Sequence, residues 1–323
     1  MLDSILGSLK VVALATKTDF RSVTSREVAL FEGPMGWGEF SPFLEYSYEE
    51  SVPWLLSGIE AAFVETPLGV RHAIEVNATL PSIDDPEEIE KLLNGFEGAK
   101  VVKIKVGGEP EIDLARIACV RELRPQAKIR LDVNGLWSVN QAHAFLIHAG
   151  EIEYVEQPCS TIEELRELKL RMEIKIAGDE IIRKSKDPFK LQLFGAIDIV
   201  MLKVAPLGGI SRALEIARHY SLPVAVSSAL ESAIGISHGL KLAAAVPELN
   251  FACGLGTGAL LAVDVGELPI VDGKIEVADV TPDSLALNKF AVSNERLNWW
   301  KNRIRMTWAA GAEETINESG WSA

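Results

Sequence analysis

The sequence predicts an α/β fold in which a (β/α)8-type barrel, a modified TIM barrel, carries an α+β capping domain. Strand-like and helix-like segments alternate along the middle of the chain, while the N-terminal part has a different pattern punctuated by Gly and Pro. Charged residues also recur at Lys105, Asp132, Glu156, Asp179 and Lys203, with spacings of 27, 24, 23 and 24 residues. A strand, a helix and two loops of a barrel use about that many residues.

We expect residues 1–70 to form the N-terminal part of the capping domain. The elements expected there are strands at 9–16 and 26–32, a loop at 18–25, a turn-like segment at 33–43 and a helix at 48–65. Residues 284–323 are expected to return to the cap, with a frayed polar tail from residue 310 onward.

Residues 71–283 are expected to form the barrel. The strand-like runs lie at 73–80, 101–106, 128–133, 152–156, 174–179, 198–204, 223–228 and 249–253. The helix-like segments lie at 86–93, 111–124, 138–149, 161–172, 187–194, 209–220 and 232–246, and Asp85 and Ser138 stand where helices should start. This alternation predicts βαβ units and a parallel sheet, and eight such strands favour a closed barrel.

The composition narrows the class of partner. A net charge of −14 without a run of Lys or Arg argues against nucleic acid and anionic membranes. The chain has no long apolar run and no secretory pattern at its start, so we expect no membrane insertion and a cytoplasmic protein. Three scattered cysteines fit reduced thiols. We expect a small-molecule carboxylate as substrate, and either a monomer or a homo-oligomer.

The charged residues at the strand ends should meet at one end of the barrel, because catalytic groups of this fold lie at the carboxyl ends of its strands. Lys105 and Lys203 fall four strands apart, which is half a turn of the barrel. Asp132, Glu156 and Asp179 occupy the arc between these lysines. Three converging carboxylates repel one another unless a cation lies among them, and oxygen ligands without Cys or His suit Mg²⁺.

A single Lys at a strand end is usually solvated, and a single Asp or Glu there is often a loop cap. Six such residues, with Lys103 on the same strand face as Lys105, are harder to explain in that way. The pattern therefore predicts removal of a proton next to a carboxylate, with a neutral lysine as base and a metal ion taking up the developing charge. A Schiff-base lysine enzyme and a barrel that only binds its ligand remain as alternatives.

Several short motifs resemble the enolase superfamily, muconate-lactonizing subgroup, over nearly the whole chain. They are V-K-I-K-V-G (102–107), R-L-D-V-N-G (130–135), E-Q-P (156–158), A-G-D-E (177–180), L-K-V (202–204) and G-W-G-E-F-S-P-F (36–43). Each motif alone is weak, and together they are specific for the superfamily.

The resemblance implies roles for these residues. Asp132, Glu156 and Asp179 would hold Mg²⁺, for which Mn²⁺ can substitute. Lys105 would take the α-proton and then assist the leaving hydroxide as an acid, and Lys203 would stabilise the intermediate from the other face. The residues implied to bind substrate or to support the ligands from behind are Lys103, Asn134, Glu180, Ser228, Gly254 and Phe20.

Three further segments narrow the resemblance within the subgroup: residues 20–27, 227–232 and 253–258. They favour members that dehydrate 2-succinyl-6-hydroxy-2,4-cyclohexadiene-1-carboxylate by syn elimination in menaquinone biosynthesis. An N-succinylamino acid racemase, or another racemase or epimerase of the superfamily, is the alternative, because such a racemase uses the same two lysines, one on each face of the substrate. The sequence leaves both activities open.

Overall fold

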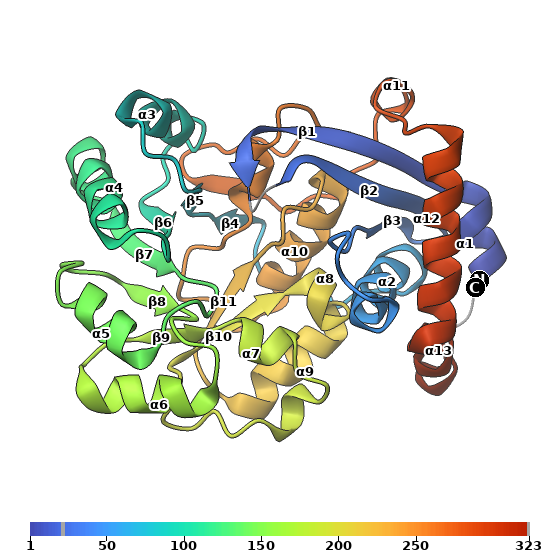
Figure 1. Ribbon diagram of the computed structural model, residues 1–323. Helices are drawn as coiled ribbons and strands as arrows, with labels where there is room; N and C mark the ends of the chain where they lie inside the picture. Colours follow the sequence, from blue (N-terminus) through green and yellow to red (C-terminus); the bar gives the residue numbers. More distant parts are fainter. Residues whose placement is uncertain (21–22, 322–323) are drawn as a thin grey trace.

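The computed structural model describes residues 1–20 and 23–321 and has the predicted α/β architecture. Parallel strands form one curled sheet in the order β11-β10-β9-β8-β7-β6-β5, with helices around it (Figure 1). These strands are β5 (Ala78–Leu80), β6 (Val101–Lys105), β7 (Lys128–Asp132), β8 (Tyr154–Glu156), β9 (Ile176–Gly178), β10 (Ile199–Lys203) and β11 (Val224–Ser227).

The expected eighth strand, 249–253, is not a continuous strand. Leu249 and Gly254 make isolated bridges to β11, whereas Cys253 bridges to Val76 beyond the opposite edge of the sheet. The segment thus pairs at single points with two neighbours, so it links the two edges without forming a ladder with either. The expected strand 73–80 is also divided, because β4 (Ala73–Glu75) pairs antiparallel with β12 (Lys274–Glu276) and only β5 joins the main sheet.

Six helices cover the sheet close to their expected positions. They are α3 (Pro86–Asn94), α4 (Pro110–Leu123), α5 (Val139–Leu146), α6 (Ile162–Arg171), α9 (Ile210–Tyr220) and α10 (Ala233–Ala245). The helix expected at 187–194 is wrong. Only a 3-10 turn, η1 (Pro188–Lys190), forms there, and the chain is extended again at Leu191. Short helices α7 (Glu180–Arg183) and α8 (Val204–Leu207) follow β9 and β10 directly.

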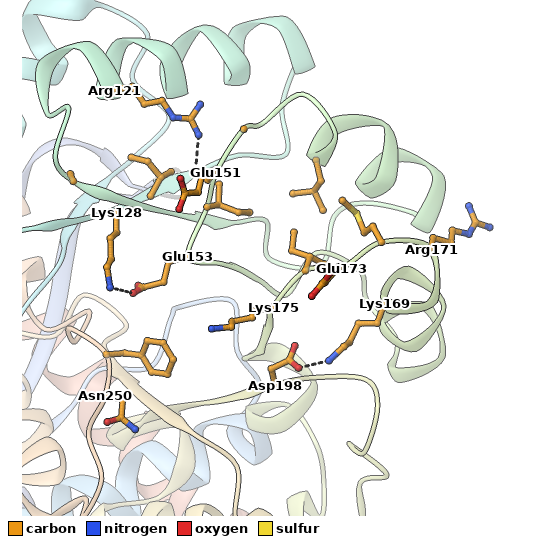
Figure 2. A pocket seen from close by; sticks show the side chains of 18 of the residues that line it. Arg121, Lys128, Glu151, Glu153, Lys169, Arg171, Glu173, Lys175, Asp198 and Asn250 are labelled. Atoms are coloured by element: carbon orange, nitrogen blue, oxygen red, sulfur yellow. Dashed lines mark hydrogen bonds and ion pairs between the residues drawn. The ribbon is translucent and has the colours of Figure 1, made fainter.

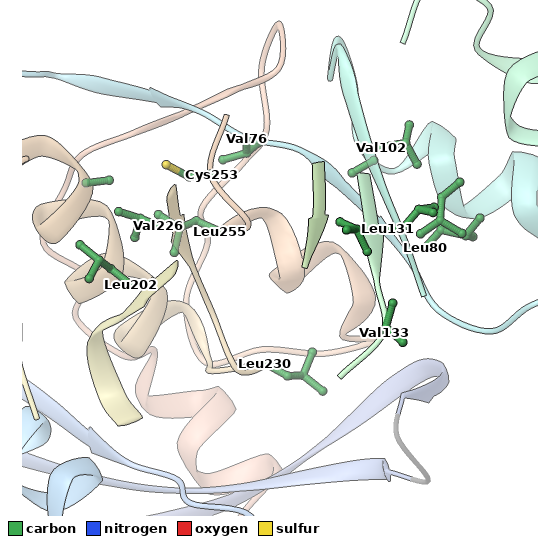
Figure 3. Close-up of a cluster of buried hydrophobic side chains, with 14 of the residues drawn as sticks. Val76, Leu80, Val102, Leu131, Val133, Leu202, Val226, Leu230, Cys253 and Leu255 are labelled. Carbon is green, nitrogen blue, oxygen red and sulfur yellow. The ribbon is translucent and has the colours of Figure 1, made fainter. Parts of the chain in front are cut away.

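Alternation along the strands decides which side chains face the barrel interior. Val102 and Ile104 of β6 belong to the apolar cluster between the strands and the helices. Figure 3 shows part of this cluster, where Val102 lies near Leu80 and Leu131 of the neighbouring strands. Since successive strand residues point to opposite faces, the buried residues that alternate with these apolar ones, such as Lys105, face the interior.

The cap contains an antiparallel sheet and two N-terminal helices. Its elements are α1 (Leu2–Ser8), β1 (Lys10–Phe20), β2 (Val23–Gly33), β3 (Gly36–Phe40) and α2 (Tyr48–Phe63). The expected loop at 18–25 is wrong for its described residues, since β1 runs to Phe20 and β2 begins at Val23, while residues 21–22 lie outside the described part of the structure. The turn-like segment 33–43 contains β3, whose Gly38 packs so closely that an added Cβ would lie 2.1 Å from the Gly58 carbonyl oxygen. Close packing therefore explains this glycine.

The C-terminal segment packs on the same side as the N-terminal elements (Figure 1). It contains α11 (Ser284–Lys289), α12 (Asn294–Thr307), the π-helical turn η3 (Trp308–Ala312) and α13 (Glu313–Ser319). The expected frayed tail is wrong for α13, because Ala312 and Ile316 are four residues apart and both are buried in the cap cluster with Trp300. No helix of the described residues is both long and apolar enough to span a bilayer.

Candidate active site

The parallel register brings the charged strand ends to one end of the sheet. Lys105 lies opposite Asp132, Asp132 lies opposite Glu156, and Lys203 lies opposite Ser227. A small cavity of about 30 Å³ lies at this end of the sheet, and of the three predicted acids only Asp132 lines it. Its lining residues are Phe43, Thr79, Lys103, Lys105, Asp132, Arg183, Lys203, Ser227, Ser228, Ala229 and Thr257. Both predicted lysines therefore line one cavity.

Each carboxylate of the predicted trio lies within ion-pair distance of a lysine. Lys103 Nζ is 2.9 Å from Glu156 Oε2 and 3.3 Å from Asp132 Oδ2. Lys105 Nζ is 2.8 Å from Asp132 Oδ2, and Lys203 Nζ is 2.6 Å from an oxygen of the third acid, at the end of β9. All these side chains are buried, so the charges are held by one another and not by solvent.

Burial and pairing shift these groups in different directions. Burial and the charge of Asp132 raise the pKa of Glu156, although Lys103 and Lys203 act against the rise. Burial also acts to raise the pKa of Asp179, but Lys203 and a neighbouring guanidinium outweigh it and lower that pKa. Burial opposes the charged form of Lys103, yet the two acids beside it raise its pKa. The pKa of Glu156 is thus raised mainly by burial, whereas that of Asp179 is lowered by the cations beside it.

The chemistry of these donors fits a hard divalent cation. Asp132, Glu156 and Asp179 offer only carboxylate oxygens and are at most 2% exposed. Glu156 Oε1 is buried and makes no hydrogen bond with any described residue, and Lys203 Nζ is 3.7 Å from it. Among residues 1–20 and 23–321, however, no three His, Cys, Asp or Glu side chains already stand in a metal-binding arrangement. In this structure the acids are paired with lysines.

Two residues implied to support the ligands lie behind the cavity. Asn134 accepts a hydrogen bond from Lys105 Nζ and donates one to Glu180 Oε1 at 3.0 Å. Arg183 Nη2 donates to the same Glu180 oxygen at 2.7 Å. Asn134 has φ +55°, a left-handed conformation that Asn tolerates better than most residues. The end of β7 is therefore linked to α7 through side chains.

The other implied substrate residues are placed differently. Ser228 Oγ donates to the Gly254 carbonyl oxygen at 2.6 Å and lies 2.8 Å from Thr257 Oγ1. A side chain at Gly254 would meet Ser227 Oγ at 2.4 Å, so this close approach requires glycine. Ser228 lines the cavity, whereas Gly254 lies behind it. Phe20 ends β1, and its side chain lies outside the described part of the structure.

Sequence reasoning missed six residues that line the cavity: Phe43, Thr79, Arg183, Ser227, Ala229 and Thr257. Phe43 belongs to a motif that the resemblance used, but nothing in the sequence assigns its side chain to the site. Arg183 follows Asp179 by four residues, a spacing that joins side chains on a helix, and could have been found from it. The threonines depend on contacts between distant segments.

A much wider hollow, of about 1660 Å³, lies at the other end of the barrel (Figure 2). Its lining includes Lys128 at the start of β7 and three residues just before β8, β9 and β10: Glu153, Lys175 and Asp198. Lys128 and Glu153 are ion-paired there at 3.0 Å. Because barrel enzymes place their chemistry at the carboxyl ends of the strands, the small cavity is the candidate active site despite its size.

Comparison with known proteins identifies the family to which this chain belongs. Residues 11–62 match the family described as "Enolase N-terminal domain-like", and residues 87–282 match "Enolase C-terminal domain-like". The chain is 46% identical over 310 residues to the o-succinylbenzoate synthase of Mycolicibacterium smegmatis, covering 94% of this chain and 96% of that protein. It is also 46% identical over 311 residues to the protein of the same name from Mycobacterium tuberculosis, covering 94% of each.

Solved structures support the fold. The muconate lactonizing enzyme from Pseudomonas putida superposes with a TM-score of 0.73 at 22% identity, covering 88% of this chain and 98% of that one. An N-succinyl Arg/Lys racemase from Bacillus cereus superposes with a TM-score of 0.72 at 20% identity, covering 88% and 97%. At these identities the two structures speak for the fold alone. The family matches and the relatives at 46% identity show that this chain belongs to the enolase superfamily and, within it, to the o-succinylbenzoate synthase family.

Proposed function

We propose that this chain is an o-succinylbenzoate synthase, a carbon–oxygen lyase that removes water from 2-succinyl-6-hydroxy-2,4-cyclohexadiene-1-carboxylate in menaquinone biosynthesis. The observation that carries the proposal is that Lys105 and Lys203 line one cavity, each ion-paired with an acid, Asp132 at the end of β7 and Asp179 just after β9. The identity to relatives of that name supports the choice of substrate.

Lys105 is proposed to take the proton from the ring carbon that bears the carboxylate, and the electron pair of that C–H bond moves into the carboxylate to give an enediolate. This pair then returns to form the new ring double bond as the C–O bond breaks and its electrons leave with the hydroxide. The same amine then returns the proton to the departing hydroxide, which leaves as water. A syn elimination places both events on one face of the ring, so one lysine can perform both. Lys203 would remain protonated beside Asp179 and stabilise the negative charge that develops on the substrate carboxylate.

Asp132, Glu156 and Asp179 would hold Mg²⁺, or Mn²⁺ in its place, since they are buried and offer oxygen ligands only. The bound cation would stabilise the developing negative charge of the substrate carboxylate. For the acids to serve as ligands, Lys103 and Lys203 must give up part of their present pairing with them. Lys103 would then keep positive charge next to Lys105.

The proposal includes the division of the chain into a cap (1–70), a barrel (71–283) and a segment that returns to the cap (284–323). One apolar cluster contains Ile5, Phe31, Trp300 and Ile316, which supports grouping the first and last parts together. We also propose a cytoplasmic location, which follows from the pathway and not from the fold.

Turnover of the cyclohexadiene substrate tests the activity. The protein should convert it with Mg²⁺ or Mn²⁺ present, lose the activity in EDTA and regain it when either ion is restored. An N-succinylamino acid should be offered in the same preparation, because two lysines along one cavity would also suit proton exchange on both faces. Racemisation without dehydration would replace the proposal by its alternative. Turnover in EDTA, with substrate trapped on lysine by borohydride, would favour a Schiff base.

A further inference from the structure

The cap contributes one wall of the cavity through residues 41–46, called here the capping segment. Phe43 lines the cavity and is buried. Its ring packs edge-on against Tyr46 and Trp54, with centroid distances of 5.6 and 6.0 Å. This aromatic group forms an apolar wall in a site whose other residues are mostly charged or polar, and its placement should matter for the ring of a substrate.

Two buried arginines of the cap hold the backbone of the capping segment. Arg303 of α12 donates to the carbonyl oxygens of Phe43 and Tyr46, each at 2.9 Å. Arg26 of β2 donates to the carbonyl oxygen of Ser41 and lies over the Phe43 ring, 4.5 Å from its centroid. These contacts fix the segment to the cap, but they do not reach the acids of the barrel.

A third arginine makes that connection. The side chain of Arg183 in α7 is 6% exposed, and its Nε donates to both oxygens of Asp179 at 3.2 Å. Its Nη2 donates to Glu180 at 2.7 Å. Its Nη1 donates to the Tyr46 hydroxyl at 3.1 Å. One rigid, planar guanidinium thus contacts a proposed metal ligand, its neighbour and the capping segment at once.

We propose that Arg183 is a positioning residue. By bonding both Asp179 and the Tyr46 hydroxyl, it fixes the capping segment relative to Asp179 and thereby sets how tightly the substrate ring is held against Phe43. The inference rests on the proposed function for its substrate. Among the described residues, no hydrogen bond joins Tyr46 to either proposed catalytic lysine or to any of the three proposed metal ligands. Loss of its hydroxyl should therefore weaken substrate binding and leave the chemical step intact, which raises KM without lowering kcat.

The first test is Tyr46→Phe, which removes one hydroxyl and keeps the ring contacts. We expect KM for the cyclohexadiene substrate to rise about tenfold, with kcat within about twofold of the wild type. Mg²⁺ affinity, measured by calorimetry, should not change. Tyr220→Phe is the matched control, because its hydroxyl donates to carbonyl oxygens of Pro188 and Leu191 on the outside of the barrel. It should leave KM unchanged.

The second test is Arg183→Lys, which keeps the charge and loses the three-way geometry. We expect weaker Mg²⁺ binding by calorimetry, because Asp179 is no longer held by Nε, and a KM at least as high as that of Tyr46→Phe. In the Arg183→Lys background, Tyr46→Phe should change KM by less than about twofold, because the bond is already lost. A tenfold effect in that background would overturn the inference.

Hydrogen exchange measured by mass spectrometry separates this inference from the proposed function. In substrate-free protein, a peptide covering 41–47 should exchange faster in Tyr46→Phe than in the wild type and should be unchanged in Tyr220→Phe. Unchanged exchange in Tyr46→Phe, or an unchanged KM, would each overturn the inference, even if Arg183→Lys does not fold. If the wild type does not turn over the substrate, the proposed function fails, and the exchange result still decides whether Arg183 and Tyr46 fix the segment.

Discussion

Lys105 and Lys203 are each held by a buried carboxylate, at 2.8 Å from Asp132 and 2.6 Å from Asp179. Burying such ions costs several kcal/mol per charge, and their mutual attraction repays this only in part. Apolar residues of similar size would make a more stable barrel end. A chain that keeps six charges there, with Lys103 and Glu156 among them, is therefore better explained by chemistry than by stability.

Lys105→Ala should abolish dehydration, because the proposed base and acid are the same amine. We expect turnover to fall by at least about 10²- to 10⁴-fold, the range for loss of an acid–base group. Mg²⁺ binding should persist, because the three acids remain. Lys128→Ala, on an exposed lysine at the opposite end of the barrel, is the control. Near-normal turnover of Lys105→Ala would remove this residue from its assigned role.

Glu156→Gln should weaken Mg²⁺ binding at least tenfold, because it replaces a fully buried carboxylate by a neutral amide among the proposed ligands. Calorimetric titration with Mg²⁺ measures this directly, without need of substrate. The same substitution at Glu163, which is exposed on α6, is the control. An unchanged titration curve for Glu156→Gln would contradict the metal assignment.

At the scale of elements, helix starts were predicted correctly where the capping residue lies within the segment itself. Asp85 caps α3 by accepting from the amides of Glu87 and Glu88, both at 3.0 Å, and Ser138 caps α5, as predicted. The prediction of a helix at 187–194 was wrong because its apolar residues resemble a helix face, whereas the backbone is already extended at Leu191 and ends η1 there. A short apolar run cannot by itself tell a helix from a buried loop.

Packing between β3 and α2 gives a prediction at this scale. Gly58 lies inside α2, where alanine would be favoured by about 1 kcal/mol on propensity alone. A Cβ there would lie 2.6 Å from the Glu39 carbonyl oxygen, so Gly58→Ala should instead destabilise the protein by about 1–3 kcal/mol. Urea unfolding measures the change.

Gly7 of α1 provides the matched comparison. It is exposed in a helix, and an added Cβ would meet no atom of the described residues within 4 Å. Gly7→Ala should therefore raise the free energy of unfolding by about 0.5–1 kcal/mol. If both substitutions stabilise the protein, the close contact between β3 and α2 does not exist in solution.

For the molecule as a whole, buried acids join the cap to the barrel. Glu39 of β3 accepts hydrogen bonds from the amide and hydroxyl of Ser232 and from the amide of Gly235, at the start of α10. Glu231 lies beside this contact, and its Oε2 accepts from the amide of Ala229, which lines the site. The position of the cap is therefore connected to the loop after β11.

This junction should make stability depend on pH. Burial, with the charge of Glu39, raises the pKa of Glu231 from 4.5 to about 7. A folded state with a raised carboxyl pKa binds the proton more tightly than the unfolded state. The stability that this proton contributes is therefore complete below a pH of about 4.5 and is lost as pH rises through about 7. Glu231→Gln imitates the protonated form. The free energy of unfolding of this variant, minus that of the wild type, should therefore be about 2 kcal/mol larger at pH 8 than at pH 5.

Urea unfolding of both proteins at several pH values between 5 and 8 checks this expectation. Glu163→Gln, on the surface, should show no such dependence on pH. A constant difference in stability between Glu231→Gln and the wild type over this range would show that the buried carboxyl does not titrate there.

The sequence by itself determined the alternation of strands and helices, the strand-end residues from Lys105 to Lys203, and hence the fold class and the kind of chemistry. These features are local or periodic, and in parallel strands periodicity alone brings the same end of every strand together. The placement of Phe43 and Arg183, the division of 73–80 and the isolated bridges around Cys253 were decided only by the tertiary structure. Each depends on contacts between segments far apart in the chain, and no pattern within one segment records which distant partner will lie against it.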